Sequence, residues 1–151
     1  MYQKLSFTSV LAAIIQKVEQ NTGLRCYDGI PKDAEMPYYH VQMVGTIPEP
    51  SKTMQKDRYQ VVILVFADAP NGSSVPIFEA IQKLEEALTE DIELPGDFYF
   101  ITPVFGIDDD DYEVTLQIPN GLSQILDEED GTKHAVLGYD FVVFSGYKVK
   151  I

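Results

Sequence analysis

Cys26 and His40 are the residues of this chain best suited to nucleophilic chemistry. They lie in the segment CYDGIPKDAEMPYYHV, residues 26–41, and Cys26 is the only cysteine. A catalytic thiol needs a lowered pKa and a histidine positioned to accept its proton. Alternation along the predicted strands separates the two, because His40 lies on the face opposite Tyr39 and Val41. We therefore predict that Cys26 is a small buried hydrophobic residue.

Two runs of acids are the candidates for a metal site. One run, residues 127–130, reads DEED, and the other consists of four consecutive aspartates: Asp108, Asp109, Asp110 and Asp111. A calcium loop needs oxygen ligands at alternate positions, a glycine and a late bidentate glutamate, and neither run has that register. Adjacent carboxylates are typical of solvated turns, which is what we predict for both runs. A metal-dependent hydrolase, the last-ranked alternative, would lose its activity in Asp110→Asn and Asp111→Asn.

Recognised catalytic motifs are absent from the sequence. It contains no glycine-rich phosphate loop, G-x-S-x-G, H-E-x-x-H or C-x-x-C. The two histidines, His40 and His134, share no spacing typical of metal ligands. We therefore predict a protein that is not an enzyme and that needs no cofactor.

The negative charge is concentrated in one part of the chain. The net charge is −13, and residues 79–130 hold 16 of the 24 acids and a single base, Lys83, for a local net charge of −15. The other residues hold 8 acids and 10 bases, for a net charge of +2. Binding to a nucleic-acid backbone requires lysine and arginine, so this distribution argues against it. It suits a surface that repels nucleic acid, or a contact between an acidic and a basic region.

Length and composition predict one globular domain over residues 1–151. The chain is 45% hydrophobic, enough for a substantial core, and its single cysteine excludes an internal disulfide and fits a reducing compartment. The longest apolar run, residues 61–67, is too short to cross a membrane. The apolar N-terminus continues a helical pattern and lacks a cleavage site, so we expect a cytoplasmic protein without a secretion signal.

Hydrophobic periodicity predicts two amphipathic helices and six strands. Gly23 should end the first helix, and Ser73 or Ser74 should cap the second. The helices are expected over residues 5–20 and 75–89, and the strands over residues 24–28, 38–44, 56–67, 98–105, 112–118 and 134–149. The helical residues expected to be buried are Phe7, Val10, Leu11, Ile14, Ile15, Val18, Ile77, Ile81, Leu84 and Leu88.

Two strands carry the clearest patterns. The strand over 56–67 is apolar on both sides, so we predict a central strand with both faces covered. In the strand over 112–118, Tyr112, Val114, Leu116 and Ile118 alternate with polar residues, which predicts one solvated face. Residues 119–131 are expected to form a loop. The element order predicts an α+β fold, with two helices packed on a largely antiparallel or mixed sheet of about five to six strands.

The order of elements and the segment YDGIP…PYYHV resemble the small phage tail terminator, or tail completion, proteins. The resemblance covers residues 5 to about 90, and the acidic stretch at 106–130 departs from the pattern. Its structure-bearing positions in this sequence are Tyr27, Asp28, Pro31, Pro37 and Tyr38.

The resemblance implies a structural protein of phage or prophage tails that acts in the bacterial cytoplasm during assembly and in the virion tail. It implies a homo-oligomeric ring, commonly of six subunits, that stops tail-tube polymerisation and joins tail-tube and head-completion proteins. No membrane or sequence-specific nucleic-acid binding is expected. The residues predicted to meet between subunits are the basic Lys52, Lys56 and Arg58 and the acidic Asp108, Asp109, Asp110 and Asp111.

An acidic decoy is the alternative from a different functional class. Such a protein would mimic DNA and occupy a basic site on a nuclease or repressor, and the carboxylate runs motivate this reading. A DNA mimic should spread its acids over one face at phosphate-like spacing, whereas many acids here lie in tight runs. Capture of a basic DNA-binding protein, without tail proteins, would favour the decoy.

Overall fold

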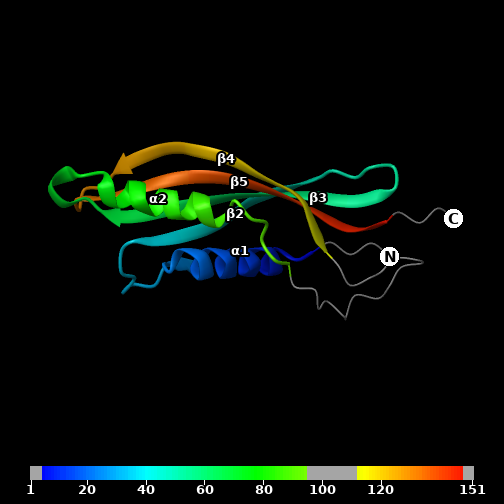
Figure 1. Cartoon of the computed structure of the whole chain (residues 1–151), viewed down its shortest axis with the longest axis horizontal. Coiled ribbons are helices and arrows are strands. Elements are labelled where there is room, and N and C mark those ends of the chain that lie inside the picture. Colours follow the sequence, from blue (N-terminus) through cyan, green and yellow to red (C-terminus); the bar gives the residue numbers. More distant parts are fainter. Residues whose placement is uncertain (1–4, 95–111, 148–151) are drawn as a thin grey trace.

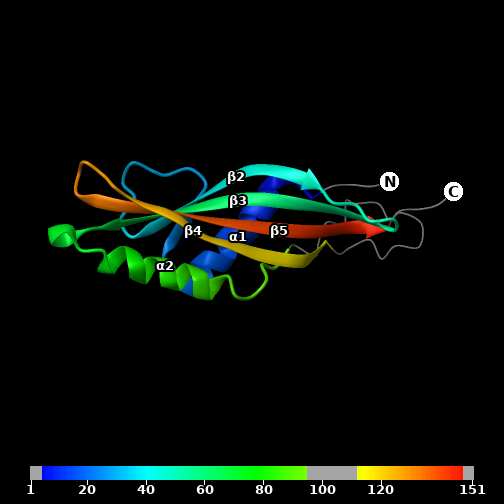
Figure 2. The same cartoon turned by 90° about the horizontal axis from the view of Figure 1, so that it is seen from above.

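The structure, a computed structural model, describes residues 5–94 and 112–147. One layer is a five-stranded sheet, and a second layer consists of two helices on one side of it (Figures 1 and 2). The elements are α1 (Phe7–Thr22), β1 (Arg25–Tyr27), β2 (Tyr38–Pro48), β3 (Met54–Asp68), a 3-10 turn (Pro70–Gly72), α2 (Val75–Ala87), β4 (Glu113–Asp127) and β5 (Thr132–Tyr147).

The sheet has the order β1-β2-β3-β5-β4. The short β1 is parallel to β2, and every other neighbouring pair is antiparallel. The sheet is therefore mixed and mostly antiparallel, and the predicted α+β class is confirmed. The strand expected over residues 98–105 lies outside the described residues.

α1 begins two residues later than expected, after the N-cap Ser6, and ends at Gly23 as predicted. The Ser6 side chain accepts a hydrogen bond from the backbone N–H of Ser9 at 3.2 Å, and Gly23 ends the helix with a φ of 75°. The buried stripe includes the predicted Val10, Ile14 and Val18. Phe7 was expected in this stripe but is 46% exposed, because it occupies the first turn, at the margin of the core.

α2 carries the predicted buried residues Ile77, Ile81 and Leu84, and the predicted Leu88 is its buried C-cap; each is at most 6% exposed. Its N-cap is Ser74, while the neighbouring Ser73 accepts a hydrogen bond from the backbone N–H of Val75. No helix within residues 5–94 and 112–147 is long and apolar enough to cross a membrane.

β3 lies at the centre of the sheet, as predicted, but only one of its faces is covered. Val61, Ile63 and Val65 are at most 2% exposed because they face the helices; we call this side of the sheet the covered face. The alternate residues Val62 and Leu64 are only half-buried. The prediction of cover on both faces is wrong because α1 and α2 pack on the same side (Figures 1 and 2). We call the other side the open face.

β4 is twice as long as expected, and the predicted loop over residues 119–131 is wrong in its first part. Residues 119–127 continue the strand, and only the residues that follow it form a turn. Asn120-Gly121 resembles a turn signal, but Gly121, with a φ of 81°, is accommodated at a bulge instead. Pro119 is tolerated because β4 lies at the edge of the sheet, where an N–H can be dispensed with.

The predicted alternation in the first half of β4 also fails after Val114. A bulge between Val114 and Leu116 shifts the register by one residue. Val114 packs against the core, whereas Leu116 turns to the open face and is 51% exposed. Gln117, expected on the solvated face, takes the covered face opposite Phe141.

Candidate assembly surfaces

The segment 26–41 is a connection between two parallel strands, and it separates the candidate nucleophile from its candidate base. Cys26 is 3% exposed on the covered face, and burial, then the nearby Glu19 and Asp28 carboxylates, raises its pKa to about 12. Its thiol therefore stays protonated at neutral pH. His40 lies on the opposite face and donates from Nε2 to the Asp28 carbonyl oxygen at 3.0 Å. This geometry fits the predicted structural role of Cys26.

The two tyrosines among the structure-bearing positions, Tyr27 and Tyr38, meet at one end of the open face. Tyr27 and Tyr38 make an edge-to-face contact with ring centroids 5.8 Å apart. Tyr38 stacks on Phe66 at 5.0 Å, and Phe66 stacks on His134 at 5.5 Å. The row of four rings thus crosses β1, β2, β3 and β5 and ties the short β1 to the rest of the sheet.

The other structure-bearing positions lie in the loop between β1 and β2. Pro31 accepts a backbone hydrogen bond from Ala34 at 3.2 Å, and the Met36–Pro37 peptide bond is cis. Pro31, Pro37 and Asp28 are all exposed. Their side chains therefore lie at the surface of the molecule, although their partners in an assembly stay a matter of prediction.

The basic residues predicted to meet a neighbouring subunit lie at the hairpin that joins β2 to β3. Lys52 is exposed at its tip, and Lys56 lies on the open face of β3. Arg58 is already paired within its own chain: its Nε is 2.5 Å from Glu49 and its Nη1 is 3.0 Å from Asp140. The hydrogen bonds that Arg58 donates to these two carboxylates raise its pKa. Lys52 and Lys56 are thus the more available charges for a partner.

The acidic run Asp108, Asp109, Asp110 and Asp111 lies outside the described residues. The other run, DEED at 127–130, forms a tight turn between β4 and β5, as predicted. Glu128 and Gly131 close this turn through backbone hydrogen bonds. Asp130 accepts from the hydroxyl and the backbone N–H of Thr132, which lowers its pKa. Within the described part of the chain, no group of three potential metal ligands occurs.

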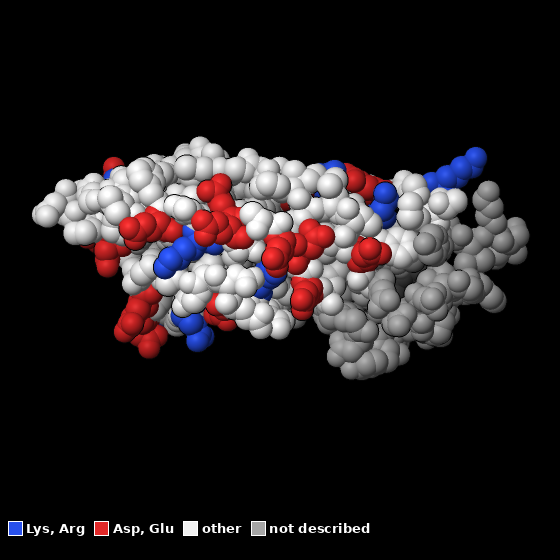
Figure 3. Space-filling view, viewed as in Figure 1, with Lys and Arg blue, Asp and Glu red and all other residues white. Residues whose placement is uncertain are grey.

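A second acidic surface follows α2 and the residues after it. Its carboxylates are exposed and gather on the face seen in Figure 3. Within the chain, Glu90 pairs with Lys17 of α1 at 2.9 Å. The residues of this acidic surface are Glu79, Glu85, Glu86, Glu90, Asp91 and Glu93.

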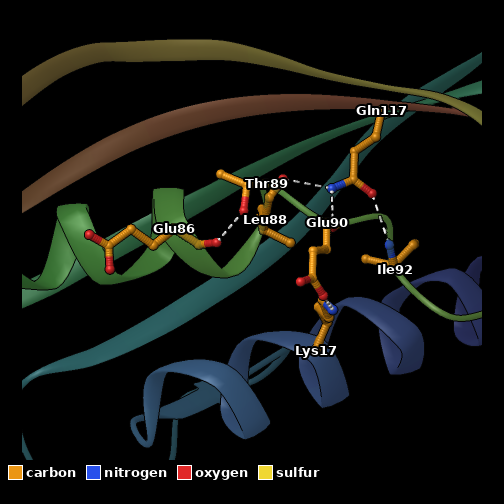
Figure 4. Close-up of polar contacts among 7 residues, drawn as sticks. All are labelled: Lys17, Glu86, Leu88, Thr89, Glu90, Ile92 and Gln117. Atoms are coloured by element: carbon orange, nitrogen blue, oxygen red, sulfur yellow. Dashed lines mark hydrogen bonds and ion pairs between the residues drawn. The ribbon is translucent and has the colours of Figure 1, made fainter.

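Gln117 fastens the end of the acidic surface to the sheet, a role that the sequence pattern did not reveal. Its amide nitrogen donates to the carbonyl oxygens of Leu88 at 2.9 Å and Glu90 at 3.0 Å, and its oxygen accepts from the Ile92 N–H at 3.0 Å (Figure 4). One side chain thus satisfies three backbone groups beyond α2. The bulge after Val114 brings Gln117 to this position, and a regular alternation could not have predicted it.

The surface beside α1 has a shallow depression with a largely polar lining. It has a volume of about 200 Å³ and is lined by Gln16, Lys17, Gln20 and Glu93, among others. Small-molecule sites are usually larger and mostly apolar. This depression therefore lacks the size and lining of a typical small-molecule site.

Comparison with known proteins gives two findings. The sequence matches, over residues 1–151, the family model described as "Putative tail termination protein". Its fold is similar to a chain in the structure entitled "Virion of native gene transfer agent (GTA) particle", with a TM-score of 0.65 and 16% identity, covering 93% of this chain and 100% of the other. No curated protein sequence matches this chain significantly.

Proposed function

We propose that this chain, which belongs to the family of phage tail termination proteins, forms a ring that caps the tail tube. Membership of that family makes it a structural protein of phage tails, and the resemblance seen in the segment YDGIP…PYYHV is confirmed. The observation that carries the proposal is the family match, because it extends over all of residues 1–151. The ring, its position at the end of the tube and the absence of enzymatic activity belong to the proposal.

The structural neighbour supports a role in a particle. Its title names a virion, and the two chains share their fold over nearly their whole lengths at 16% identity. We propose that this chain likewise assembles with other virion proteins, with the tail tube on one side and head-completion proteins on the other. Six subunits are the expected number, and the virion tail is the expected location.

The charges of the chain suit such an assembly. An exposed acidic surface runs along α2, while Lys52 and Lys56 lie at the β2–β3 hairpin. Acidic side chains facing the lumen of a ring would repel passing DNA and let it slide. Opposite charges on different parts of one surface favour a repeated contact between copies. Asp108, Asp109, Asp110 and Asp111 stay predicted contributors to this contact.

Mass measurement tests the ring. The purified protein is analysed by native mass spectrometry and light scattering, alone and with its major tail-tube protein. We expect a closed oligomer, of about six subunits, under at least one of these conditions. Images of the oligomer by electron microscopy should show rings with a central hole. A strict monomer under both conditions would contradict the proposal.

A further inference from the structure

The outer side of β2 is unevenly paired along its length. β1 pairs only with Tyr38, Tyr39 and His40, and no other described strand pairs with β2 on that side. We call Val41–Ile47 the β2 edge; it contains one bulge, between Met43 and Gly45. Within it, Val44 is 63% exposed and Ile47 is 45% exposed. Large apolar side chains thus flank a strand edge beside which the described part of the chain places no further strand.

The outer side of β4, the other edge strand, is also divided into two halves. Its second half is unsuited to pairing, because it contains Pro119 and two bulges, one between Pro119 and Gly121 and one between Leu122 and Gln124. Its first half, Glu113–Ile118, contains a single bulge and displays Leu116 at 51% exposure. We call this first half the β4 edge.

The β2 edge and the β4 edge lie toward the same end of the sheet. Along the sheet, Ile47 lies opposite Arg58, Arg58 lies opposite Val142, and Val142 lies opposite Leu116. The two edges also run in opposite directions, because each of β2, β3, β5 and β4 is antiparallel to the next. A second copy placed with its β4 edge beside the β2 edge would therefore continue the antiparallel order.

The side chains of the two edges are compatible. Because Ile47, Arg58 and Leu116 share the open face, pairing the edges would bring the two apolar residues to one side of the joined sheet. The hairpin with Lys52 and Lys56 would approach Glu113, the acid at the start of the β4 edge. Unpaired edges are commonly protected by charges or proline, whereas these two expose valine, isoleucine and leucine.

We infer that the β4 edge of one copy pairs with the β2 edge of the next copy, so that the sheet continues from subunit to subunit around the ring. The contact joins two different surfaces of the chain, and such a heterologous contact closes into a ring when the rotation permits. This inference rests on the proposed ring and specifies its interface.

Lysine substitutions at the centres of the two edges test the inference. Val44→Lys and Leu116→Lys each introduce a charge on an exposed side chain, so both variants should fold, with unchanged circular dichroism and melting temperature. Each variant alone should associate at least tenfold more weakly than the wild type, measured by native mass spectrometry. The measurement is made under the condition in which the wild type forms an oligomer, either alone or with the tail-tube protein. Val75→Lys is the matched control, because Val75 is 57% exposed on α2, and it should retain the oligomer.

Mixing the two variants gives a sharper test of the pairing. Val44→Lys keeps an intact β4 edge, and Leu116→Lys keeps an intact β2 edge. An equimolar mixture should therefore form dimers with one functional contact and no larger species. A pairing of identical edges would instead leave one of the two variants fully oligomeric, which would overturn the inference.

The outcomes separate this inference from the function on which it rests. If the wild type forms a closed oligomer and both lysine variants do so with equal affinity, the edge pairing is wrong and the ring stands. If the wild type is monomeric with and without the tail-tube protein, the ring itself is wrong, and the edge pairing is lost with it.

Discussion

The two faces of the central sheet differ in what they contribute to the molecule. On the covered face, Tyr39, Tyr59 and Ile63 are completely buried, and the Tyr39 hydroxyl donates to the Ala80 carbonyl oxygen of α2 at 2.6 Å. On the open face, the corresponding residues of β3 are half-buried, and Arg58 pairs with two carboxylates. The helices bury the side chains of the covered face. On the open face, the side chains are held only by contacts with their neighbours in the sheet.

This difference separates stability from assembly. The covered face removes most apolar area from water, so it should dominate the free energy of folding. The open face and its two edges retain apolar and charged groups that a partner could still bury. A comparison of substitutions on the two faces, made on the dissociated chain, should therefore give unequal losses of stability.

Ile63→Ala should produce the largest effect. Ile63 is 0% exposed between Val61 and Val65 on the covered face, and its truncation leaves a cavity worth about 4 kcal/mol of unfolding free energy. Leu64→Ala, one residue away on the open face, should cost only about 1 kcal/mol, since its side chain is already partly in water. Urea unfolding measures both values, and equal losses would mean that the faces do not differ.

Gln117→Ala should have the second largest effect, about 2 kcal/mol. It removes three hydrogen bonds to the backbone of residues 88–92, where Leu88 and Ile92 are each only 4% exposed. Hydrogen exchange should speed up at the Ile92 amide in particular. Gln124→Ala, an exposed glutamine of the same strand, is the control and should cost less than about 0.5 kcal/mol. Equal losses of unfolding free energy in the two variants would mean that the Gln117 hydrogen bonds do not stabilise the covered face.

The sequence predicted best those elements whose pattern is set by the covered face. α1, α2, β3 and β5 repeat their apolar residues at regular spacing, and all four elements are present as predicted. The predicted length and facing of β4 were wrong. A bulge changes which residues face the core, and the amino-acid composition of the strand does not reveal it. Asn120-Gly121 has the composition of a turn, yet in an edge strand it forms a bulge.

The assembly surfaces were harder to predict from the sequence than the fold. Val62 and Leu64 look as apolar as Val61 and Ile63, and the sequence alone does not reveal that both helices choose the same side. The basic residues were identified by charge, but only the structure shows that Arg58 is engaged by Glu49 and Asp140. The edge residues Val44 and Leu116 carry no signal at all, since their importance depends on where pairing stops.

Alkaline pH should weaken the covered face selectively. Burial raises the pKa of the Cys26 thiol from 9.0 to about 12, so the unfolded chain loses this proton first. The protonated thiol contributes fully to the free energy of unfolding below pH 9. This contribution is lost as the pH rises from about 9 to about 12, at up to about 1.4 kcal/mol per pH unit. Tyr139, whose pKa burial raises from 10.0 to about 12, acts in the same direction at higher pH.

Cys26→Ala isolates the thiol's part of this pH dependence. Urea unfolding at pH 8 and pH 10 should show that the wild type loses about 1 kcal/mol more than the variant between these two values. An identical loss in both proteins would mean that the thiol is not protected by burial on the covered face.

Arg58→Gln should cause the smallest loss of unfolding free energy, because it removes ion pairs on the open face and no buried apolar contact. The Arg58 side chain is 22% exposed and that of its partner Glu49 is 35% exposed, so water reaches this ion pair and screens part of its attraction. Asp140 also keeps a second partner, the Asn120 amide at 3.1 Å, and is not left uncompensated when the arginine is removed. The expected loss of unfolding free energy at low salt is smaller than that of the other variants, and it should shrink in 1 M NaCl, where the screening length is about 3 Å.

Lys56→Gln, on the same strand and face, is the control for Arg58→Gln and should change stability by less than about 0.5 kcal/mol. A loss for Arg58→Gln as large as that for Ile63→Ala, and unchanged by salt, would mean that the ion pairs stabilise the fold as a buried network does. The open face would then share the stabilising role of the covered face, and the separation of stability from assembly would fail. A small, salt-sensitive loss would instead leave the open face available for contacts between subunits, because disturbing it would not unfold the chain.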